Sequence, residues 1–386
     1  MSNIESSFNL PDSDPIERIV LHPIAMPLVE TLTTSFGGDA LRPAILVELH
    51  MGGVVGWGEC VAGWSPGYSY ETIGTAMHIL SDFFIPAVVG KTNLKGLAKF
   101  RGHPMARMAL ESAYWATVAQ CRGVNVGDLF GATNRKTRAD VGVSIGIQSS
   151  IDATLAVIQK RFAEGYRRIK LKIKPGWDIQ MLRAVRQSYP DIRLMADANS
   201  AYTLDDAPLF RQMDELNLLM IEQPLGHDDI YQHGKLQPQL HTPICLDESI
   251  RNVDDARLAI ETGAGRIINL KPARVGGLIE SLKLHAYCFE AGISLWIGGM
   301  LETGVGRSMQ LALASLPGVT LPSDISATSR YYDPDITNEV FTLNAEDSTI
   351  TVPNGIGLSV TVNPERLAKA EAAFNAVKKS QFMGLQ

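Results

Sequence analysis

The chain has 386 residues, a formal net charge of −6 and 45% hydrophobic residues. This length suits a large α/β domain with a smaller companion, and the scattered basic residues argue against a nucleic-acid surface or a polybasic membrane patch. Apolar runs stay shorter than the roughly 18 residues of a membrane helix, and the cysteines lack metal-type spacing. We therefore expect a cytoplasmic protein with reduced, buried thiols.

The N-terminal part predicts a small α+β domain. Residues 1–15 are polar and are expected to form a mobile tail. Residues 16–59 read as strand, turn and strand, with the turn at Gly52 and Gly53, and helical patterns then continue to about Gly131. We interpret residues 16–135 as a capping domain.

From residue 141 the pattern changes to short apolar strands that alternate with amphipathic helices at a spacing of about 25 residues. The expected strands are 141–147, 168–173, 192–199, 218–224, 242–248, 266–271, 293–298 and 319–322. Such a repeat favours a (β/α)₈ TIM-type barrel over residues 136–332, whereas a flavodoxin-like stack usually needs fewer units. Residues 333–386 contain strand-like segments and a final helix, and are expected to return to the cap.

Charged residues stand at the expected C-terminal ends of successive middle strands. They are Lys172, Asp197, Glu222, Asp247 and Lys271, at intervals of 25, 25, 25 and 24 residues. Intervals that match the βα repeat predict one such residue per strand, all at one height, at the barrel mouth where active sites of this fold lie.

Three inward carboxylates would repel one another unless a cation lies between them. Ligands made only of oxygen favour Mg²⁺, with Mn²⁺ as a substitute. The alternative is that the acids pair with the lysines across the barrel, but five residues in register favour the metal.

Lys172 and Lys271 lie on expected strands 2 and 6, opposite each other around the barrel. That arrangement suits removal of a proton from one side of a carbon and its return on the other. Lys170 and the metal are expected to lower the pKa of Lys172, and Arg274 that of Lys271. The residues thus predict proton abstraction α to a carboxylate through a metal-stabilised enediolate.

The same residues carry a family resemblance. The motifs are KLK (170–172), DAN (197–199), IEQP (221–224), LDES (246–249) and NLKPARVGG (269–277). They resemble the mandelate racemase and muconate-lactonizing branch of the enolase superfamily. TSFGG (34–38), GWGECVA (56–62), GHPMAR (102–107), VGVSIGI (141–147), KPGW (174–177) and GGMLETGVGRSMQLALASLPG (298–318) narrow it to the o-succinylbenzoate synthase and N-succinylamino acid racemase group.

The resemblance implies that Asp197, Glu222 and Asp247 bind Mg²⁺ and that Lys172 and Lys271 are the acid/base pair, with Lys170 tuning Lys172. It also implies substrate contacts and an orienting carboxylate: Ser144, Asn199, Glu302, Ser35 and Phe36 for the substrate, and Glu248 to orient a base or ligand. A small carboxylate substrate and a homo-oligomer are implied too. The chain departs from the group at Lys174, where an acid is common, and at Ile297 of WIGGM, where WCGGM is usual.

The resemblance implies an N-succinylamino acid (N-acylamino acid) racemase with o-succinylbenzoate synthase capability, and Arg274 beside Lys271 favours racemisation. The alternatives are the synthase alone, another cycloisomerase or a dipeptide epimerase. A Schiff-base aldolase and a non-catalytic binding barrel are further alternatives that leave the aligned carboxylates unexplained.

The run from Gly304 to Arg307 is expected either to bind an anion through helix amides or to form a tight turn.

Overall fold

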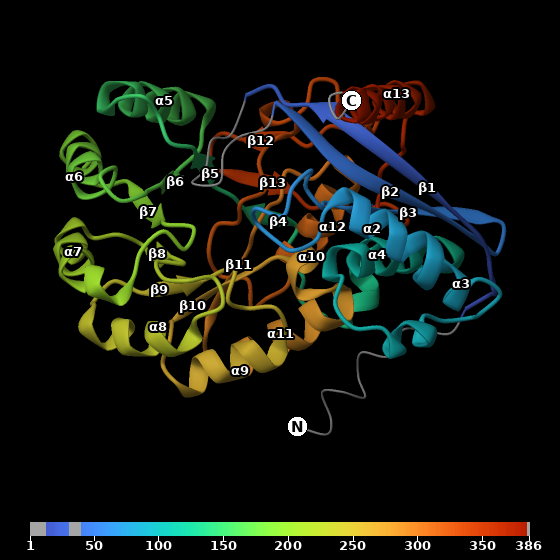
Figure 1. Cartoon of the computed structure of the whole chain (residues 1–386), viewed down its shortest axis with the longest axis horizontal. Helices are drawn as coiled ribbons and strands as arrows, with labels where there is room; N and C mark the ends of the chain where they lie inside the picture. Colours follow the sequence, from blue (N-terminus) through green and yellow to red (C-terminus); the bar gives the residue numbers. More distant parts are fainter. Residues whose placement is uncertain (1–12, 31–39, 384–386) are drawn as a thin grey trace.

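The computed structural model describes residues 13–30 and 40–383. Figure 1 shows an antiparallel sheet with its helices on one side and a ring of strands and helices on the other. The sheet consists of β1 (Ile16–Pro27), β2 (Leu41–Met51) and β3 (Val54–Cys60), in that order. Gly52 and Gly53 join β2 to β3 with positive φ angles of 59° and 75°, as the predicted hairpin turn requires.

A long buried helix, α4, packs against β2 and β3. Two glycines of β3 allow the close approach, because a Cβ at Gly56 would lie 2.1 Å from Thr117 Oγ1 and one at Gly58 would lie 2.0 Å from the Ala109 carbonyl oxygen. The helical elements of this region are α2 (Ile73–Ile79), η1 (Leu80–Phe84), α3 (Ile85–Val88), η2 (Lys95–Lys99), α4 (Pro104–Arg122) and η3 (Val126–Phe130).

The second part of the molecule is a curled parallel sheet. Within the described residues its strand order is β11-β10-β9-β8-β7-β6-β5. The strands are β5 (Val143–Ile145), β6 (Arg168–Lys172), β7 (Arg193–Asp197), β8 (Ile221–Glu222), β9 (Ile244–Leu246), β10 (Ile267–Leu270) and β11 (Ser294–Ile297). Sequence order follows spatial order throughout, as in a barrel built from repeated βα units.

The predicted eighth strand at 319–322 does not form a regular strand. Residues 319–324, here called the closing segment, instead join the sheet through isolated bridges, from Val319 to Leu295 of β11 and from Ser323 to Val141. Pro322 lacks a backbone N–H, which prevents a continuous ladder. The segment still lies between β11 and the chain that enters β5, so it occupies the eighth position of the ring.

Helical segments follow the strands, and those that come after β5 to β9 lie around the outside of the sheet (Figure 1). They are α5 (Ile151–Glu164), α6 (Ile179–Ser188), η4 (Leu204–Asp206), α7 (Ala207–Met213), η5 (Asp214–Leu216), α8 (Ile230–Leu236), η6 (Gln237–Gln239), α9 (Val253–Glu261), α10 (Pro272–Val275), α11 (Leu278–Glu290), α12 (Gly304–Ala314) and η7 (Thr328–Arg330). Within residues 13–30 and 40–383, no helix is both long and apolar enough to cross a membrane.

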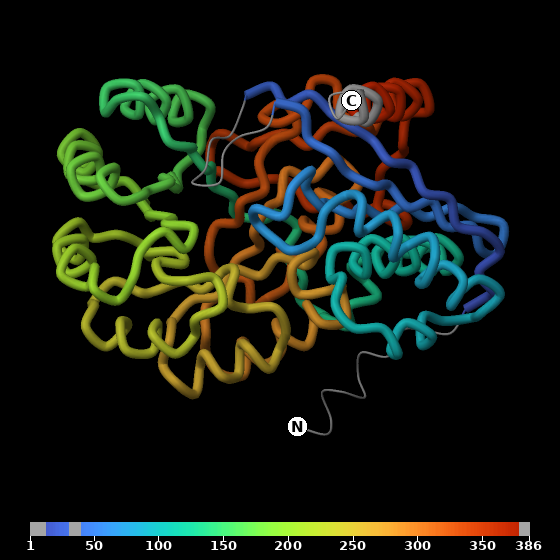
Figure 2. Tube along the Cα trace, viewed as in Figure 1, coloured from blue at the N-terminus to red at the C-terminus, as the bar shows by residue number. Residues whose placement is uncertain are grey.

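The C-terminal segment runs back across the molecule. Its strands β12 (Leu343–Asn344) and β13 (Thr349–Thr351) extend a small sheet with β4 (Arg138–Asp140), and α13 (Pro364–Met383) packs on β1. Figure 2 shows this last helix beside the first strand. Phe374 of α13 stacks on Trp64 with ring centroids 5.4 Å apart. The exact domain boundaries stay a prediction.

The expectation for the cysteines was partly wrong. Cys60, Cys245 and Cys288 are buried free thiols, but Cys121 at the end of α4 is exposed. The expected tail lies mostly outside the described residues. Its last part is held in place, since the Ser13 amide donates to the Thr92 carbonyl at 3.2 Å.

Candidate active site

The carboxylates and lysines of the 25-residue pattern lie on successive strands. Lys172 pairs directly with Asp197 across β6 and β7, and Asp197 pairs with Glu222 across β7 and β8. The next strand is staggered, because Glu222 pairs with Cys245, which places Asp247 two residues further toward the strand end.

The stagger continues at β10. Leu246 pairs with Ile268, so Asp247 is level with Asn269 and Lys271 lies two residues beyond it. The register thus advances by four residues from β6 to β10, as the shear of a closed sheet of tilted strands requires. The common height of the five residues along the barrel axis stays a prediction.

Lys172 and Lys271 each contact a carboxylate of the next or preceding strand. Lys172 Nζ donates to Asp197 Oδ2 at 2.6 Å and to Asn199 Oδ1 at 2.7 Å. Lys271 Nζ donates to Asp247 Oδ2 at 2.7 Å. Since β6 and β10 are four positions apart in the ring, the two ammonium groups approach the carboxylates from opposite sides.

Lys170 lies deeper in the barrel. Its Nζ donates to Glu222 Oε2 at 3.1 Å, lies 3.3 Å from Asp197 Oδ2 and forms an ion pair with Asp324. Burial alone would lower the pKa of Lys170, but these carboxylates outweigh burial and raise it. Lys170 and Lys172 thus contact the same carboxylate, as the predicted influence of one lysine on the other requires.

Arg274 contacts the same carboxylate as Lys271. It forms an ion pair with Asp247 Oδ1 and donates from Nε to the Ile250 carbonyl at 2.7 Å. Burial alone would lower the pKa of Lys271, but Tyr68, Glu248 and Glu222 outweigh it and raise that pKa. The lowering of the Lys271 pKa that we expect from Arg274 stays a prediction.

Tyr68 brings the capping loop to the same point. Lys271 Nζ donates to the Tyr68 hydroxyl at 3.1 Å and lies 4.6 Å from the ring centroid. The hydroxyl in turn donates to Asp247 Oδ1 at 3.4 Å. One catalytic candidate of the barrel is therefore fixed by a residue from the other part of the molecule.

The donor set suits a divalent cation. Asp197, Glu222 and Asp247 are at most 1% exposed. Burial and the nearby Asp197 carboxylate raise the pKa of Glu222 above its ordinary value. A hard cation bound by these oxygen ligands would offset the repulsion between the Asp197 and Glu222 carboxylates.

The carboxylates do not converge as they stand. Among the described residues, no group of three or more acidic, histidine or cysteine side chains is arranged to hold a metal ion. The reason is that each of the three carboxylates is turned toward a neighbouring donor: Lys172 for Asp197, Asn269 for Glu222 at 2.7 Å, and Lys271 for Asp247. Their oxygen chemistry and their positions on adjacent strands fit a divalent cation.

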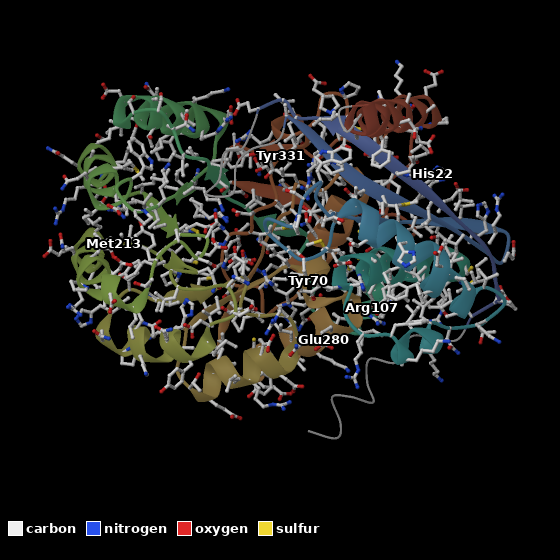
Figure 3. The ribbon with its side chains drawn as sticks, viewed as in Figure 1. His22, Tyr70, Arg107, Met213, Glu280 and Tyr331 are labelled. Atoms are coloured by element: carbon white, nitrogen blue, oxygen red, sulfur yellow. The ribbon has the colours of Figure 1, made fainter. Side chains whose placement is uncertain are left out.

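A cavity of about 570 Å³ opens beside these residues. Its wall combines cap-loop and barrel residues: Pro66, Gly67, Tyr68, Ser69, Tyr70, Pro104, Asn199, Ser200, Ala201, His227, Asp228, Glu248, Arg251 and Arg274. Tyr70 is labelled in Figure 3, where the cap meets the barrel. The cavity therefore adjoins three of the predicted site residues, Asn199, Glu248 and Arg274.

Glu248 and Asn199 are held together at this cavity. Asn199 Nδ2 donates to Glu248 Oε1 at 3.2 Å, while Glu248 Oε2 is buried without a hydrogen-bond partner. Burial is the largest cause that raises the pKa of Glu248. Asn199 has a positive φ of 41°, which turns its side chain back toward Lys172.

The other residues predicted to contact the substrate are Ser144, Glu302, Ser35 and Phe36, and the side chains of Ser144 and Glu302 have different hydrogen-bonding situations. Ser144 of β5 pairs with Lys170, and its buried Oγ has no hydrogen-bond partner. Glu302 bonds within its own loop, because its Oε2 accepts from the Met300 amide at 2.7 Å. Ser35 and Phe36 lie outside the described residues.

The start of α12 is occupied by the protein itself. Glu59 of β3 accepts hydrogen bonds from the Thr303 amide at 3.0 Å and from the Gly306 amide at 2.9 Å. Asp335 accepts from the Gly304 amide at 3.1 Å. The anion predicted for the run from Gly304 to Arg307 is therefore an internal carboxylate.

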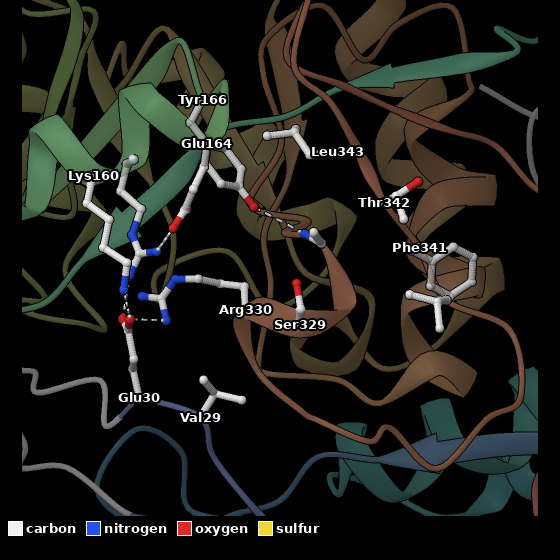
Figure 4. Close-up of a pocket in the computed structure, with 13 residues that line it drawn as sticks. Val29, Glu30, Lys160, Glu164, Tyr166, Ser329, Arg330, Phe341, Thr342 and Leu343 are labelled. Carbon is white, nitrogen blue, oxygen red and sulfur yellow. Dashed lines mark hydrogen bonds and ion pairs between the residues drawn. The ribbon is translucent and has the colours of Figure 1, made fainter.

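A second cavity, of about 350 Å³, lies outside the cluster of lysines and carboxylates (Figure 4). Here Glu30, which follows β1, is contacted by Lys160 of α5 at 2.7 Å, by Arg161 of α5 and by Arg330 at 3.1 Å. These ion pairs tie the end of the first strand to the barrel.

Sequence reasoning missed Asp324 and Tyr68. The repeat continues from Lys271 through Gly298 to Asp324, at intervals of 27 and 26 residues, and this extension would have revealed Asp324. Tyr68 carries no such signal, because the cap loop is outside the repeat.

The sequence profile of the enolase C-terminal domain-like family matches residues 153–366. N-succinylamino acid racemase from Thermus thermophilus is 47% identical over 351 residues, which cover 89% of this chain and 94% of that protein. An o-succinylbenzoate synthase from Bacillus subtilis is 46% identical over 361 residues, which cover 92% and 96% of the two chains.

A solved structure shows the same fold. A member of the enolase superfamily from Listeria innocua superposes with a TM-score of 0.88 at 38% identity, over 93% of this chain and 97% of that one. The predicted TIM-type fold class and the predicted resemblance to the racemase and synthase group are confirmed. The chain therefore belongs to the enolase C-terminal domain-like family and is an enzyme of the enolase superfamily.

Proposed function

We propose that this enzyme racemises N-succinylamino acids and other N-acylamino acids and also dehydrates a precursor to o-succinylbenzoate. The observation that carries the proposal is the pair of buried lysines, Lys172 and Lys271, on opposite sides of one cluster of carboxylates. Relatives that are 47% and 46% identical to this chain are named for the racemisation and for the synthesis respectively.

Asp197, Glu222 and Asp247 are proposed to hold Mg²⁺, with Mn²⁺ as a substitute. Enzymes of this superfamily generally use a divalent metal ion. When bound, the ion would supply positive charge to the oxygens of the substrate carboxylate, which acidifies the adjacent carbon. The carboxylates of this chain fix where that substrate group lies.

The two lysines would then move the α-proton. Lys172 is proposed to take or return it on one face of the substrate, and Lys271 on the other. Each must be neutral to act as a base, and a cation held by Asp197, Glu222 and Asp247 would lower the pKa of both ammonium groups through its positive charge. Lys170 contacts Asp197 and Glu222 from deeper in the barrel. Glu248 orients Asn199, whose side-chain oxygen accepts a hydrogen bond from Lys172.

The two reactions place different demands on Lys271. Racemisation needs it as a second base, whereas dehydration needs one base and can use the other ammonium as a fixed positive charge. Arg274 and Lys271 both form ion pairs with Asp247. The guanidinium therefore neutralises part of the negative charge that would otherwise keep Lys271 protonated. This favours racemisation alongside synthesis. Synthesis alone is the second candidate, since relatives of nearly equal identity bear each name.

Other assignments remain proposals. Ser144, with its free buried hydroxyl, is proposed to contact the substrate. Enzymes of this kind act on small carboxylate substrates. A cytoplasmic location and a homo-oligomeric state are proposed from the resemblance. A dipeptide epimerase is less well supported, because an L-Ala-D/L-Glu epimerase is 28% identical to this chain, against 47% and 46% for the racemase and the synthase, and a cycloisomerase is likewise a weaker alternative.

The test is ¹H NMR in D₂O with Mg²⁺, in which the α-proton of N-succinyl-L-phenylalanine and of its D enantiomer is followed separately. We expect both signals to disappear with the native enzyme, one enantiomer to stop exchanging in Lys172→Ala, and the other in Lys271→Ala. Lys174→Ala, at an exposed lysine just beyond β6, is the matched control and should exchange both. Absence of exchange from either enantiomer would refute racemisation of this substrate and leave synthesis to be tested.

A further inference from the structure

Lys170 occupies an unusual layer of the barrel. It lies two residues before Lys172, on the same face of β6. The residues two positions before the metal-binding candidates on the next strands are Met195, Met220 and Cys245, which form an apolar cluster with Trp296. An ammonium group is therefore buried directly beneath the cluster of carboxylates, 4.9 Å from the centroid of the Trp296 ring.

Such a buried charge needs compensation. Lys170 has three carboxylates within reach, and two of them, Asp197 and Glu222, are the candidates for metal binding. The third is Asp324 of the closing segment, which forms the shortest of the three ion pairs. Asp324 is thus the one of these partners that the metal would not require.

Asp324 is itself fixed from two directions. Its amide donates to the Ile297 carbonyl of β11 at 2.9 Å, and its Oδ1 lies 2.6 Å from Arg168 Nη1. Arg168 also donates to the Pro322 carbonyl at 2.9 Å. Space for this guanidinium depends on Gly142, since a Cβ there would lie 2.2 Å from Arg168 Nε.

We propose that Asp324 is a positioning residue that holds the Lys170 ammonium in place and so leaves Asp197 and Glu222 available to a divalent cation. The inference rests on the metal site of the proposed function. Without the Asp324 charge, Lys170 must be balanced by Asp197 and Glu222 alone, and it then competes with the cation for both. Asp324 therefore sets metal affinity without contacting the metal.

The test is the affinity for Mn²⁺, measured from the electron paramagnetic resonance signal of free Mn²⁺ in a titration of the full chain. Asp324→Asn should weaken binding by about tenfold, the size of effect expected for neighbouring charges that share partners. Lys170→Met should tighten binding, because it removes the competing ammonium. The double variant should return to within about threefold of the native affinity.

The matched control is Asp335→Asn, which removes another buried carboxylate near an arginine, 3.6 Å from Arg307, and should leave the affinity unchanged. Native affinity in Asp324→Asn would overturn the proposal, as would a double variant as weak as Asp324→Asn. If Asp324→Asn does not fold, Lys170→Met decides alone, and unchanged or weaker binding refutes the idea. Failure of the native enzyme to bind Mn²⁺ would instead refute the metal site itself.

Discussion

Glu59 of β3 accepts hydrogen bonds from both the backbone amide and the hydroxyl of Thr303, a residue of the barrel that lies more than 240 positions later in the chain. The carboxylate is buried and also accepts a hydrogen bond from the Gly306 amide, so it caps the first turn of α12. A glutamate of the capping sheet therefore completes a helix of the barrel, and its ionisation affects how the two parts fit together.

The first prediction concerns pH. Burial raises the pKa of Glu59 to about 7, despite the hydrogen bonds from Thr303, so the folded chain holds this proton more tightly than the unfolded chain does. Stability from this group is complete below the unfolded pKa of about 4.5 and is lost as pH rises through about 7. Urea unfolding between pH 5 and 8 should show this slope in the native enzyme and a smaller one in Glu59→Gln.

The matched control for pH is Glu365→Gln, at an exposed position near the start of α13. It should reproduce the native slope. A Glu59→Gln variant with the same slope as the native enzyme would show that the buried carboxylate does not titrate in this range.

The second prediction concerns metal removal. Because three buried carboxylates repel one another, a bound cation should stabilise the folded chain. After treatment with a chelator, Mg²⁺ at about 100 times its Kd should stabilise the enzyme by roughly 2.7 kcal/mol, measured by urea unfolding. Asp247→Asn should lose this gain, whereas Asp205→Asn, at an exposed position, should keep it. A gain of equal size in Asp247→Asn would remove Asp247 from the metal site.

The third prediction concerns Arg274. Its ion pair with Asp247 places it next to Lys271 but not next to Lys172. Arg274→Gln should therefore slow deuterium exchange of the enantiomer that depends on Lys271 by about tenfold or more, and that of the other enantiomer much less. Arg274→Lys retains the positive charge, so its exchange rate for the Lys271-dependent enantiomer should fall between those of the native enzyme and Arg274→Gln. Equal slowing of both enantiomers would indicate general disruption of the site.

The fourth prediction concerns the packing of β3 on α4. A Cβ at Gly58 would lie 2.0 Å from the Ala109 carbonyl oxygen, so Gly58→Ala must push the strand and the helix apart. We expect a loss of about 1–3 kcal/mol in the free energy of unfolding. Gly74→Ala in α2 is the control. The nearest atom to its added Cβ would be Thr72 Oγ1, 3.8 Å away, so this variant should not destabilise the chain. Equal stability of the two variants would contradict this packing.

Residues tied to the repeat could be predicted from the sequence. The 25-residue interval indicated the strands that carry Lys172, Asp197 and Glu222, because one βα unit returns the chain to the same end of the barrel. The interval could not reveal the stagger at Asp247 and Lys271. Shear depends on how strands pair, and pairing register leaves no mark in the spacing of residues along the chain.

Residues tied to long-range partners could not be predicted. Tyr68 contacts Lys271 only because the cap loop folds over the barrel, 203 positions away in sequence. Asp324 is different, because the spacing from Lys271 through Gly298 points to it even though Pro322 interrupts the strand pattern just before it. Glu59 gives no such signal either, since nothing in GWGECVA indicates that its carboxylate caps a distant helix.

The packing of α13 on β1 has a consequence for synthesis of the chain. β1 leaves the ribosome well before the helix that packs on it, whose buried face carries Leu367, Ala370 and Phe374. The strand must therefore remain without this cover while the whole barrel is translated. A chain truncated after the barrel would leave the α13-binding face of β1 exposed permanently. Such chains would then tend to associate with one another through that face.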